Sequence, residues 1–186
     1  MRLALKTTVT SISKAPRWVS WIPPLLHFLK LNIDGSRDHC SGRAAVGGLI
    51  RDHNGRWAHG FAVNVGITTS FLAKLWGCRE GLKLASSLGV QQLILEVDSL
   101  LAVQLIQSKK VSVGSTSVLL PDILLLIDSF SSCWVQHTLR EGNSTADYMA
   151  TIGHNVALGS VLFPTPPTGI SMILQSDCIG IMFLRM

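Results

Sequence analysis

Residues 72–99, LAKLWGCREGLKLASSLGVQQLILEVDS, begin with a helical pattern and continue with an alternating one. Small and apolar residues recur every three or four positions after Lys74, which predicts a helix lying flat on a sheet. These are Gly77, Cys78, Gly81, Leu82, Ala85 and Leu88. We expect Ser70 to cap the helix start, Gly89 to end it, and the following strand to close at Asp98. Lys74 heads the buried stripe, where an ammonium needs water or a carboxylate partner.

Three extended segments precede this helix. HFLKLNIDG alternates apolar and polar residues and ends at Asp34-Gly35. RAAVGGLIRD and RWAHGFAVNVG follow, joined through Asn54-Gly55, a strong signal for a tight hairpin. We therefore expect three antiparallel strands before the helix.

The segments after residue 99 alternate between helical and extended patterns. SLLAVQLIQS and VLLPDILLLIDSF read as helices, CWVQHTL as a strand, and NSTADYMATIGHN as a last helix with a Ser144-x-x-Asp147 start. Strands that enter through helical crossovers pair in parallel. The sequence therefore predicts an α/β fold with a mixed five-stranded sheet, three strands antiparallel and two added in parallel, flanked by helices.

Charge and composition divide the 186 residues into three parts. Residues 1–30 hold five of the 16 basic side chains and none of the 11 acidic ones, so the remainder is neutral. We expect 1–28 to be a basic leader or a fragment of an upstream region, with an organellar transit peptide as the alternative. Residues 29–155 form the domain, and 156–186 a proline-containing extension packed on it.

The composition argues against several classes of protein. No apolar run is long enough to span a bilayer, because Pro121, Asp122 and Asp128 interrupt the most apolar segment. The four cysteines are widely scattered and lack metal or disulfide spacing, which favours reduced thiols. We expect an intracellular protein, nuclear or cytoplasmic, with no membrane association.

Three aspartates stand at the ends of predicted elements: Asp34, Asp98 and Asp147. If the first and fourth strands are neighbours, Asp34 and Asp98 lie side by side. Clustered carboxylates repel unless a cation lies between them, so a cluster indicates a divalent metal and phosphodiester hydrolysis. Each aspartate alone also fits an ordinary role as a turn residue, a helix cap or a favourable charge in a first helical turn.

Four segments in order resemble the ribonuclease H type-1 family, in particular its plant branch related to reverse transcriptases. They are KLNIDGS, AAVGGLIRDHNGRW, LAKLWGCREGLKLASSLGVQQLILEVDS and REGNSTADYMA, and they cover about residues 29–155. The resemblance implies the three-layer ribonuclease H-like fold.

The resemblance also implies a site of four carboxylates that binds Mg²⁺ and cleaves the RNA strand of an RNA–DNA hybrid. It places three of them at Asp34, Asp98 and Asp147, as catalytic and metal-binding residues. The family writes the helix start as Ala-Glu-Leu-Trp, whereas this chain has Ala73-Lys74-Leu75-Trp76. The lysine therefore replaces the catalytic glutamate, and we expect Mg²⁺ binding and catalysis to be weakened or lost.

Three functional hypotheses follow. The first is a monomeric domain that binds RNA–DNA hybrids or other nucleic acid with impaired cleavage. Its expected contacts are Gly35, Ser36, Arg37, Arg51, Lys74, Arg140 and Asn143. The second is an active Mg²⁺-dependent hybrid ribonuclease that uses the three aspartates. The third is a decayed domain that serves protein contacts only.

Overall fold

The computed structural model describes residues 16–110, 116 and 118–185, and its centre is a six-stranded mixed sheet with the order β6-β5-β2-β3-β4-β7. The strands of this sheet are β2 (Leu29–Arg37), β3 (Arg43–Arg51), β4 (Trp57–Ile67), β5 (Gln92–Val97), β6 (Ser132–His137) and β7 (Gly159–Phe163). Strands β2, β3 and β4 form an antiparallel meander, and β5 and β6 add in parallel beside β2. The predicted five strands are confirmed. The sixth, β7, comes from the C-terminal extension and pairs with β4.

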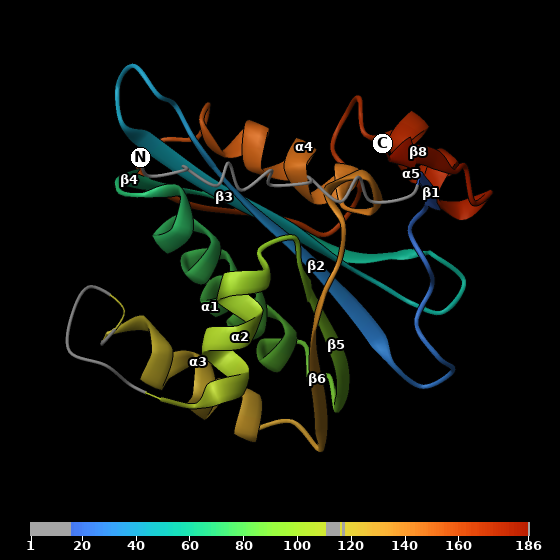
Figure 1. Cartoon of the computed structure of the whole chain (residues 1–186), viewed down its shortest axis with the longest axis horizontal. Coiled ribbons are helices and arrows are strands. Elements are labelled where there is room, and N and C mark those ends of the chain that lie inside the picture. Colours follow the sequence, from blue (N-terminus) through green and yellow to red (C-terminus); the bar gives the residue numbers. More distant parts are fainter. Residues whose placement is uncertain (1–15, 111–115, 117, 186) are drawn as a thin grey trace, which may run out of the picture.

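Helices cover both faces of the sheet and complete three layers (Figure 1). They are α1 (Ser70–Ser87), α2 (Leu100–Ser108), α3 (Leu119–Asp128), α4 (Ser144–Gly153) and α5 (Ser171–Cys178), with a short 3₁₀ turn, η1 (Arg140–Gly142). Helices α1 and α3 pack together on one face, and α4 lies on the other. A Cβ built on Gly47 would lie 2.2 Å from the Met149 carbonyl carbon, so glycine lets α4 rest directly on β3.

Helix α1 buries the stripe that its sequence predicts, with two differences at its ends. Gly77, Cys78, Gly81, Leu82 and Ala85 are buried, whereas Leu88 is 44% exposed because it is the residue at which the helix ends. The N-cap is Thr69 instead of Ser70, since the Thr69 hydroxyl accepts a hydrogen bond from the Leu72 amide. Gly89 follows with φ +70°, the left-handed conformation that commonly ends a helix.

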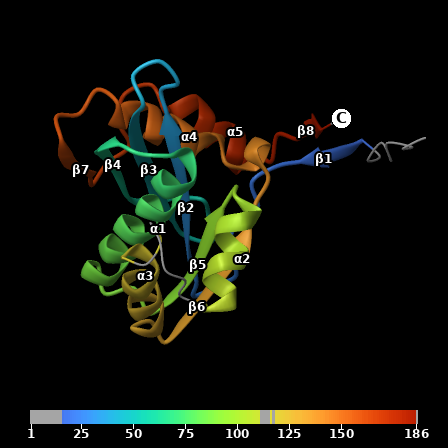
Figure 2. The ribbon, with the colours of Figure 1, turned by 60° about the vertical axis from the view of Figure 1, so that its left-hand side comes forward.

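The two ends of the described chain meet beside the main sheet. Strand β1 (Arg17–Val19) pairs antiparallel with β8 (Phe183–Arg185), and together they form a separate two-stranded ribbon (Figure 2). Part of the predicted leader, residues 16–28, is thus packed on the domain, where Trp21 is only 4% exposed. Residues 1–15 of that leader lie outside the described residues. Among the described helices, none is both long and apolar enough to cross a membrane.

Candidate functional site

Two of the three predicted aspartates come together because their strands are neighbours. Strand β2 pairs in parallel with β5, with Ile33 opposite Val97. Asp34 is the next residue on β2, and Asp98 directly follows the end of β5. Parallel strands bring the same ends to the same edge of a sheet, so both carboxylates emerge at one edge, as the sequence predicts.

Lys74 lies between these two carboxylates. Its Nζ donates hydrogen bonds to Oδ1 of Asp34 and, at 2.5 Å, to Oδ1 of Asp98. The side chains of Lys74, Asp34 and Asp98 are 16%, 5% and 10% exposed, so little water screens the two ion pairs. Lys74 is the fifth residue of α1, so it lies near the N-terminal end of that helix. The buried Lys74 ammonium thus has two carboxylate partners, where the sequence predicted that it needs water or one carboxylate.

Burial and neighbouring charges act in opposite directions on the pKa values of Asp34 and Lys74. Burial raises the pKa of the Asp34 carboxyl to about 6, the Lys74 ammonium opposes that rise, and the nearby Asp98 carboxylate adds to it. Burial by itself lowers the pKa of Lys74, but the Asp34 and Asp98 carboxylates outweigh it and hold that pKa above its usual value. Lys74 therefore remains a cation throughout the neutral range.

Asp147 lies in the first turn of α4 and has a different partner. An Oδ1 of Asp147 accepts a hydrogen bond from Nη2 of Arg140 at 3.3 Å. The Ser144-x-x-Asp147 start does not form a capping box: Asn143 is the N-cap residue, and the Ser144 hydroxyl donates to the Glu141 carbonyl oxygen. Each of the three aspartates is thus paired with a basic side chain of the protein.

The donor set does not fit the divalent cations of the ribonuclease H pattern. In the described part of the chain, no three His, Cys, Asp or Glu side chains are grouped so that they could hold a metal ion. The ammonium of Lys74 occupies the position between the Asp34 and Asp98 oxygens, and an ammonium has no lone pair with which to bind a metal.

The seven residues expected to contact nucleic acid differ in exposure and in their hydrogen-bond partners. Arg140 is well exposed, and Ser36 and Arg37 are half-buried at the end of β2. The Arg37 Nε donates to the Thr68 carbonyl oxygen, next to the start of α1. Gly35 is buried, and its amide donates to Asp34 Oδ1. The Lys74 ammonium is hydrogen-bonded to Asp34 and Asp98.

Arg51 and Asn143 require a correction, because both are buried away from any ligand. Arg51 is 1% exposed; its guanidinium is ion-paired with Asp177 at 2.7 Å and stacks on the Trp21 ring. Asn143 is 3% exposed and donates from Nδ2 to the Ile33 carbonyl oxygen at 2.9 Å. The expected nucleic-acid contacts are therefore wrong for these two residues.

Asn143 has a positioning role that its sequence context did not reveal. Its amide group ties the residue before α4 to the β2 residue before Asp34. It also accepts, through Oδ1, a hydrogen bond from Asn32, whose amide contacts Glu96 as well. The sequence shows only the polar series Lys30, Asn32 and Asp34 on β2, and nothing in that pattern indicates that these side chains are buried instead of facing water.

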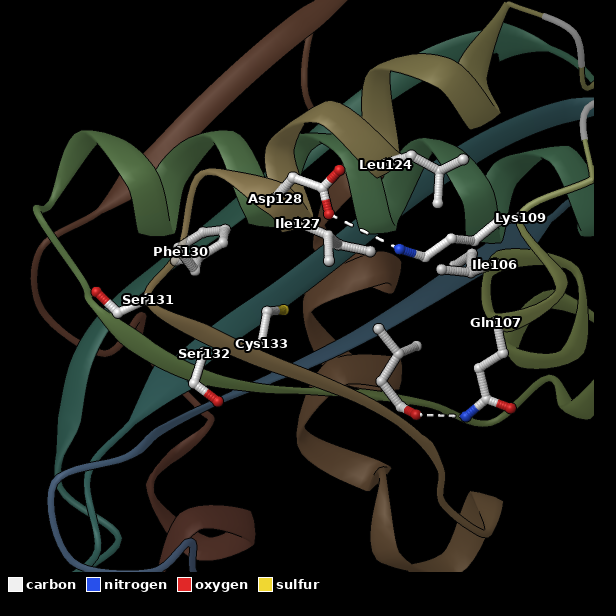
Figure 3. Close-up of a pocket in the computed structure, with 11 residues that line it drawn as sticks. Ile106, Gln107, Lys109, Leu124, Ile127, Asp128, Phe130, Ser131, Ser132 and Cys133 are labelled. Carbon is white, nitrogen blue, oxygen red and sulfur yellow. Dashed lines mark hydrogen bonds and ion pairs between the residues drawn. The ribbon is translucent and has the colours of Figure 1, made fainter.

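A separate pocket of about 470 Å³ lies between α2, α3 and the edge strand β6 (Figure 3). Apolar side chains including Leu124, Ile127 and Phe130 line it, and an ion pair between Lys109 and Asp128 spans its mouth. Burial raises the pKa of the Cys133 thiol in this pocket to about 12, so the thiol stays protonated. None of the predicted site residues lines this pocket.

Comparisons with known proteins agree with this architecture. The model of the reverse transcriptase-like family matches residues 32–153. A provisionally named ribonuclease H protein of Arabidopsis thaliana is 31% identical over 170 residues, which is 90% of this chain and 27% of that protein. The chain thus spans about a quarter of that relative's length.

Two solved structures illustrate the similarity in fold. Ribonuclease H1 of the archaeon Halobacterium salinarum superposes with a TM-score of 0.64 at 20% identity, over 70% of this chain and 99% of that one. The compost-derived LC11 ribonuclease H1, solved in complex with an RNA/DNA hybrid, gives a TM-score of 0.63 at 21% identity, over 68% and 96%.

Proposed function

This chain belongs to the reverse transcriptase-like family as a ribonuclease H-like domain, and from that premise we propose that it binds RNA–DNA hybrids without efficient cleavage. In this proposal the domain acts as a monomer. Asp34, Asp98 and Asp147 retain the ancestral positions of the metal carboxylates, and hydrolysis is impaired because Lys74 replaces the fourth.

The observation that carries this proposal is the bridge from Lys74 to both Asp34 and Asp98. Replacing a glutamate by a lysine changes the local charge by two units where the family binds cations. One unit charge about 4 Å from another is worth roughly 4 kcal/mol at an effective dielectric constant of about 20. Mg²⁺ would therefore have to displace an ammonium that already satisfies the two carboxylates.

The surface beside this bridge supports the binding half of the proposal. A hollow of about 550 Å³ lies at the start of α1, with polar lining residues Arg37, Thr68, Thr69 and Ser70 and apolar ones Ile67 and Leu72. Guanidinium groups, hydroxyls and amides at helix starts are common phosphate contacts in nucleic-acid complexes. Ser36 and Arg37 remain the candidate contacts that would hold the duplex through its backbone, whereas Arg140 is exposed but already paired with Asp147.

The deciding experiment compares the wild-type protein with Lys74→Glu on an RNA–DNA hybrid, with and without Mg²⁺. We expect the wild type to bind the hybrid in a salt-dependent manner without cutting it. Lys74→Glu should gain Mg²⁺-dependent cleavage of the RNA strand. Lys83→Glu, the same charge change at a half-exposed site on α1, is the matched control and should not cut.

The other outcomes separate the alternatives. Equal cleavage by wild type and Lys74→Glu would instead establish an active hybrid ribonuclease, with Lys74 swung aside when metal binds. Absence of both binding and cleavage in every variant would favour a domain that serves protein contacts. The exposed apolar side chains of Ile22, Leu25 and Met172 support this third hypothesis of protein contacts.

A further inference from the structure

A small pocket beside Asp147 is completed by the C-terminal strand. It has a volume of about 250 Å³ and is lined by Arg140, Glu141, Ser144, Asp147 and Phe183. Four of these residues belong to η1 and the start of α4, whereas Phe183 is the first residue of β8. The extension therefore adds one aromatic wall to the edge of the candidate site.

Two interactions hold this wall in place. Val19 of β1 pairs with Phe183 in the antiparallel ribbon, so the backbone of β8 has a partner strand. Arg185 Nη1 donates to Glu141 Oε2 at 3.2 Å, which ties the end of β8 to η1. The Phe183 residue is 42% exposed and lines the pocket, so a ligand there can contact it.

The charges around the pocket are balanced within the protein. Glu141 is paired with Arg185, and Asp147 is paired with Arg140. A phosphate would meet two carboxylates here, and neither arginine is free of an acidic partner. A neutral, planar group meets no such penalty, because it can stack on an aromatic ring and donate hydrogen bonds to carboxylate oxygens.

We propose that this pocket binds one unpaired base of a nucleic acid, stacked on Phe183 with its polar edge toward Glu141 and Asp147. The inference rests on the proposed function, because it places the base next to a strand already bound at the candidate site. Stacking on an aromatic side chain is tolerant of base identity, whereas the carboxylates favour bases with exocyclic amino groups.

The test measures fluorescence anisotropy with two RNA–DNA hybrids, one blunt and one with a short single-stranded RNA extension. We expect the wild type to bind the extended hybrid about tenfold more tightly than the blunt one, as one stacked base allows. Phe183→Ala should abolish this difference without changing the affinity for the blunt hybrid. Phe183→Tyr, which keeps the ring, should retain it.

Leu184→Ala is the matched control, since Leu184 is the next residue of β8, is similarly exposed, and does not line the pocket. It should behave like the wild type on both probes. An extension made of abasic sugar–phosphate should bind like the blunt hybrid, since the phosphates alone offer nothing to stack.

Equal affinity of the wild type for blunt and extended hybrids would overturn the inference while leaving the proposed function intact. Tight binding of the abasic extension would also overturn it, because the pocket would then recognise phosphate. Failure of the wild type to bind any hybrid would reject the proposed function, and this inference with it.

Discussion

The Lys74 ammonium lies against the Asp34 and Asp98 carboxylates, and its charge helps to set the pKa of Asp34. The ammonium supplies positive charge where the ribonuclease H pattern has metal, but it offers no coordination position for water or a phosphate oxygen. It can therefore stabilise the folded cluster without supporting metal-dependent hydrolysis. Removing the ammonium should expose the repulsion that it now compensates.

Lys74→Met should raise the pKa of Asp34 above its present value of about 6, because burial and the Asp98 carboxylate both remain. An Asp34 pKa above the unfolded value of 3.8 means that the folded state keeps a proton that the unfolded state releases. The variant should therefore lose stability as the pH rises from about 4 through the raised pKa, by about 1.4 kcal/mol for each pH unit between the unfolded and folded pKa values. Carboxyl NMR titration and urea unfolding at several pH values check this.

Lys83→Met is the control for this measurement, because Lys83 lies further along the same helix and is paired with Glu80 instead of with Asp34 or Asp98. It should leave the Asp34 titration unchanged. An Asp34 midpoint that does not move in Lys74→Met would contradict the electrostatic role given to the lysine.

At the scale of elements, local patterns predicted most of the fold. Alternation in β2, the Asn54-Gly55 hairpin signal between β3 and β4, the small-residue stripe of α1 and the alternating run of β5 all lead to the observed pairing around Asp34 and Asp98. The sixth strand and the β1–β8 ribbon were not predicted, because they pair segments far apart in the sequence. Alternation also could not reveal that Lys30 and Asn32 are buried, since polar residues on a strand usually face water.

The seating of α1 on β2 is the element-level contact on which the cluster depends. A Cβ built on Gly35 would lie 2.7 Å from both the Ala73 carbonyl carbon and the Lys74 amide nitrogen. Gly35→Ala should therefore push the start of α1 away from β2 and cost about 1–3 kcal/mol of folding stability. It should also weaken the Lys74–Asp34 contact, which would appear as a shifted Asp34 titration.

Gly77→Ala tests the same interface between α1 and β2 at a position where an added Cβ fits without a clash. Its added Cβ would lie 3.4 Å from the Asp34 carbonyl oxygen and an Ile33 methyl, which is ordinary van der Waals contact. Alanine is favoured over glycine inside a helix by about 1 kcal/mol, so this variant should be neutral or slightly more stable. Equal destabilisation by both alanines would show that the contact at Gly35 is not specially tight.

In the molecule as a whole, segments near both ends of the described chain contact the buried guanidinium of Arg51. Arg51 of β3 stacks on Trp21 from the N-terminal segment, with 3.7 Å between the guanidinium carbon and the ring centroid. It is ion-paired with Asp177 of α5, which also accepts a hydrogen bond from the Thr145 hydroxyl at 2.6 Å. Asp177 is 126 positions from Arg51, and no local pattern could predict that pairing. The C-terminal extension therefore contributes a buried counter-charge to the core of the domain.

Asp177→Ala should be strongly destabilising, because it leaves the Arg51 guanidinium buried without a carboxylate. Loss of one partner of a buried ion pair costs about 3–5 kcal/mol, and urea unfolding monitored by tryptophan fluorescence would measure it. Arg185→Ala removes a more exposed ion pair from the same extension and should cost at most about 1 kcal/mol. Restoring stability to Asp177→Ala by adding Arg51→Met, which removes the stranded charge, would identify the lost counter-charge as the cause. If Asp177→Ala were as mild as Arg185→Ala, the extension would be an accessory to the fold and the domain would be stable without its contribution.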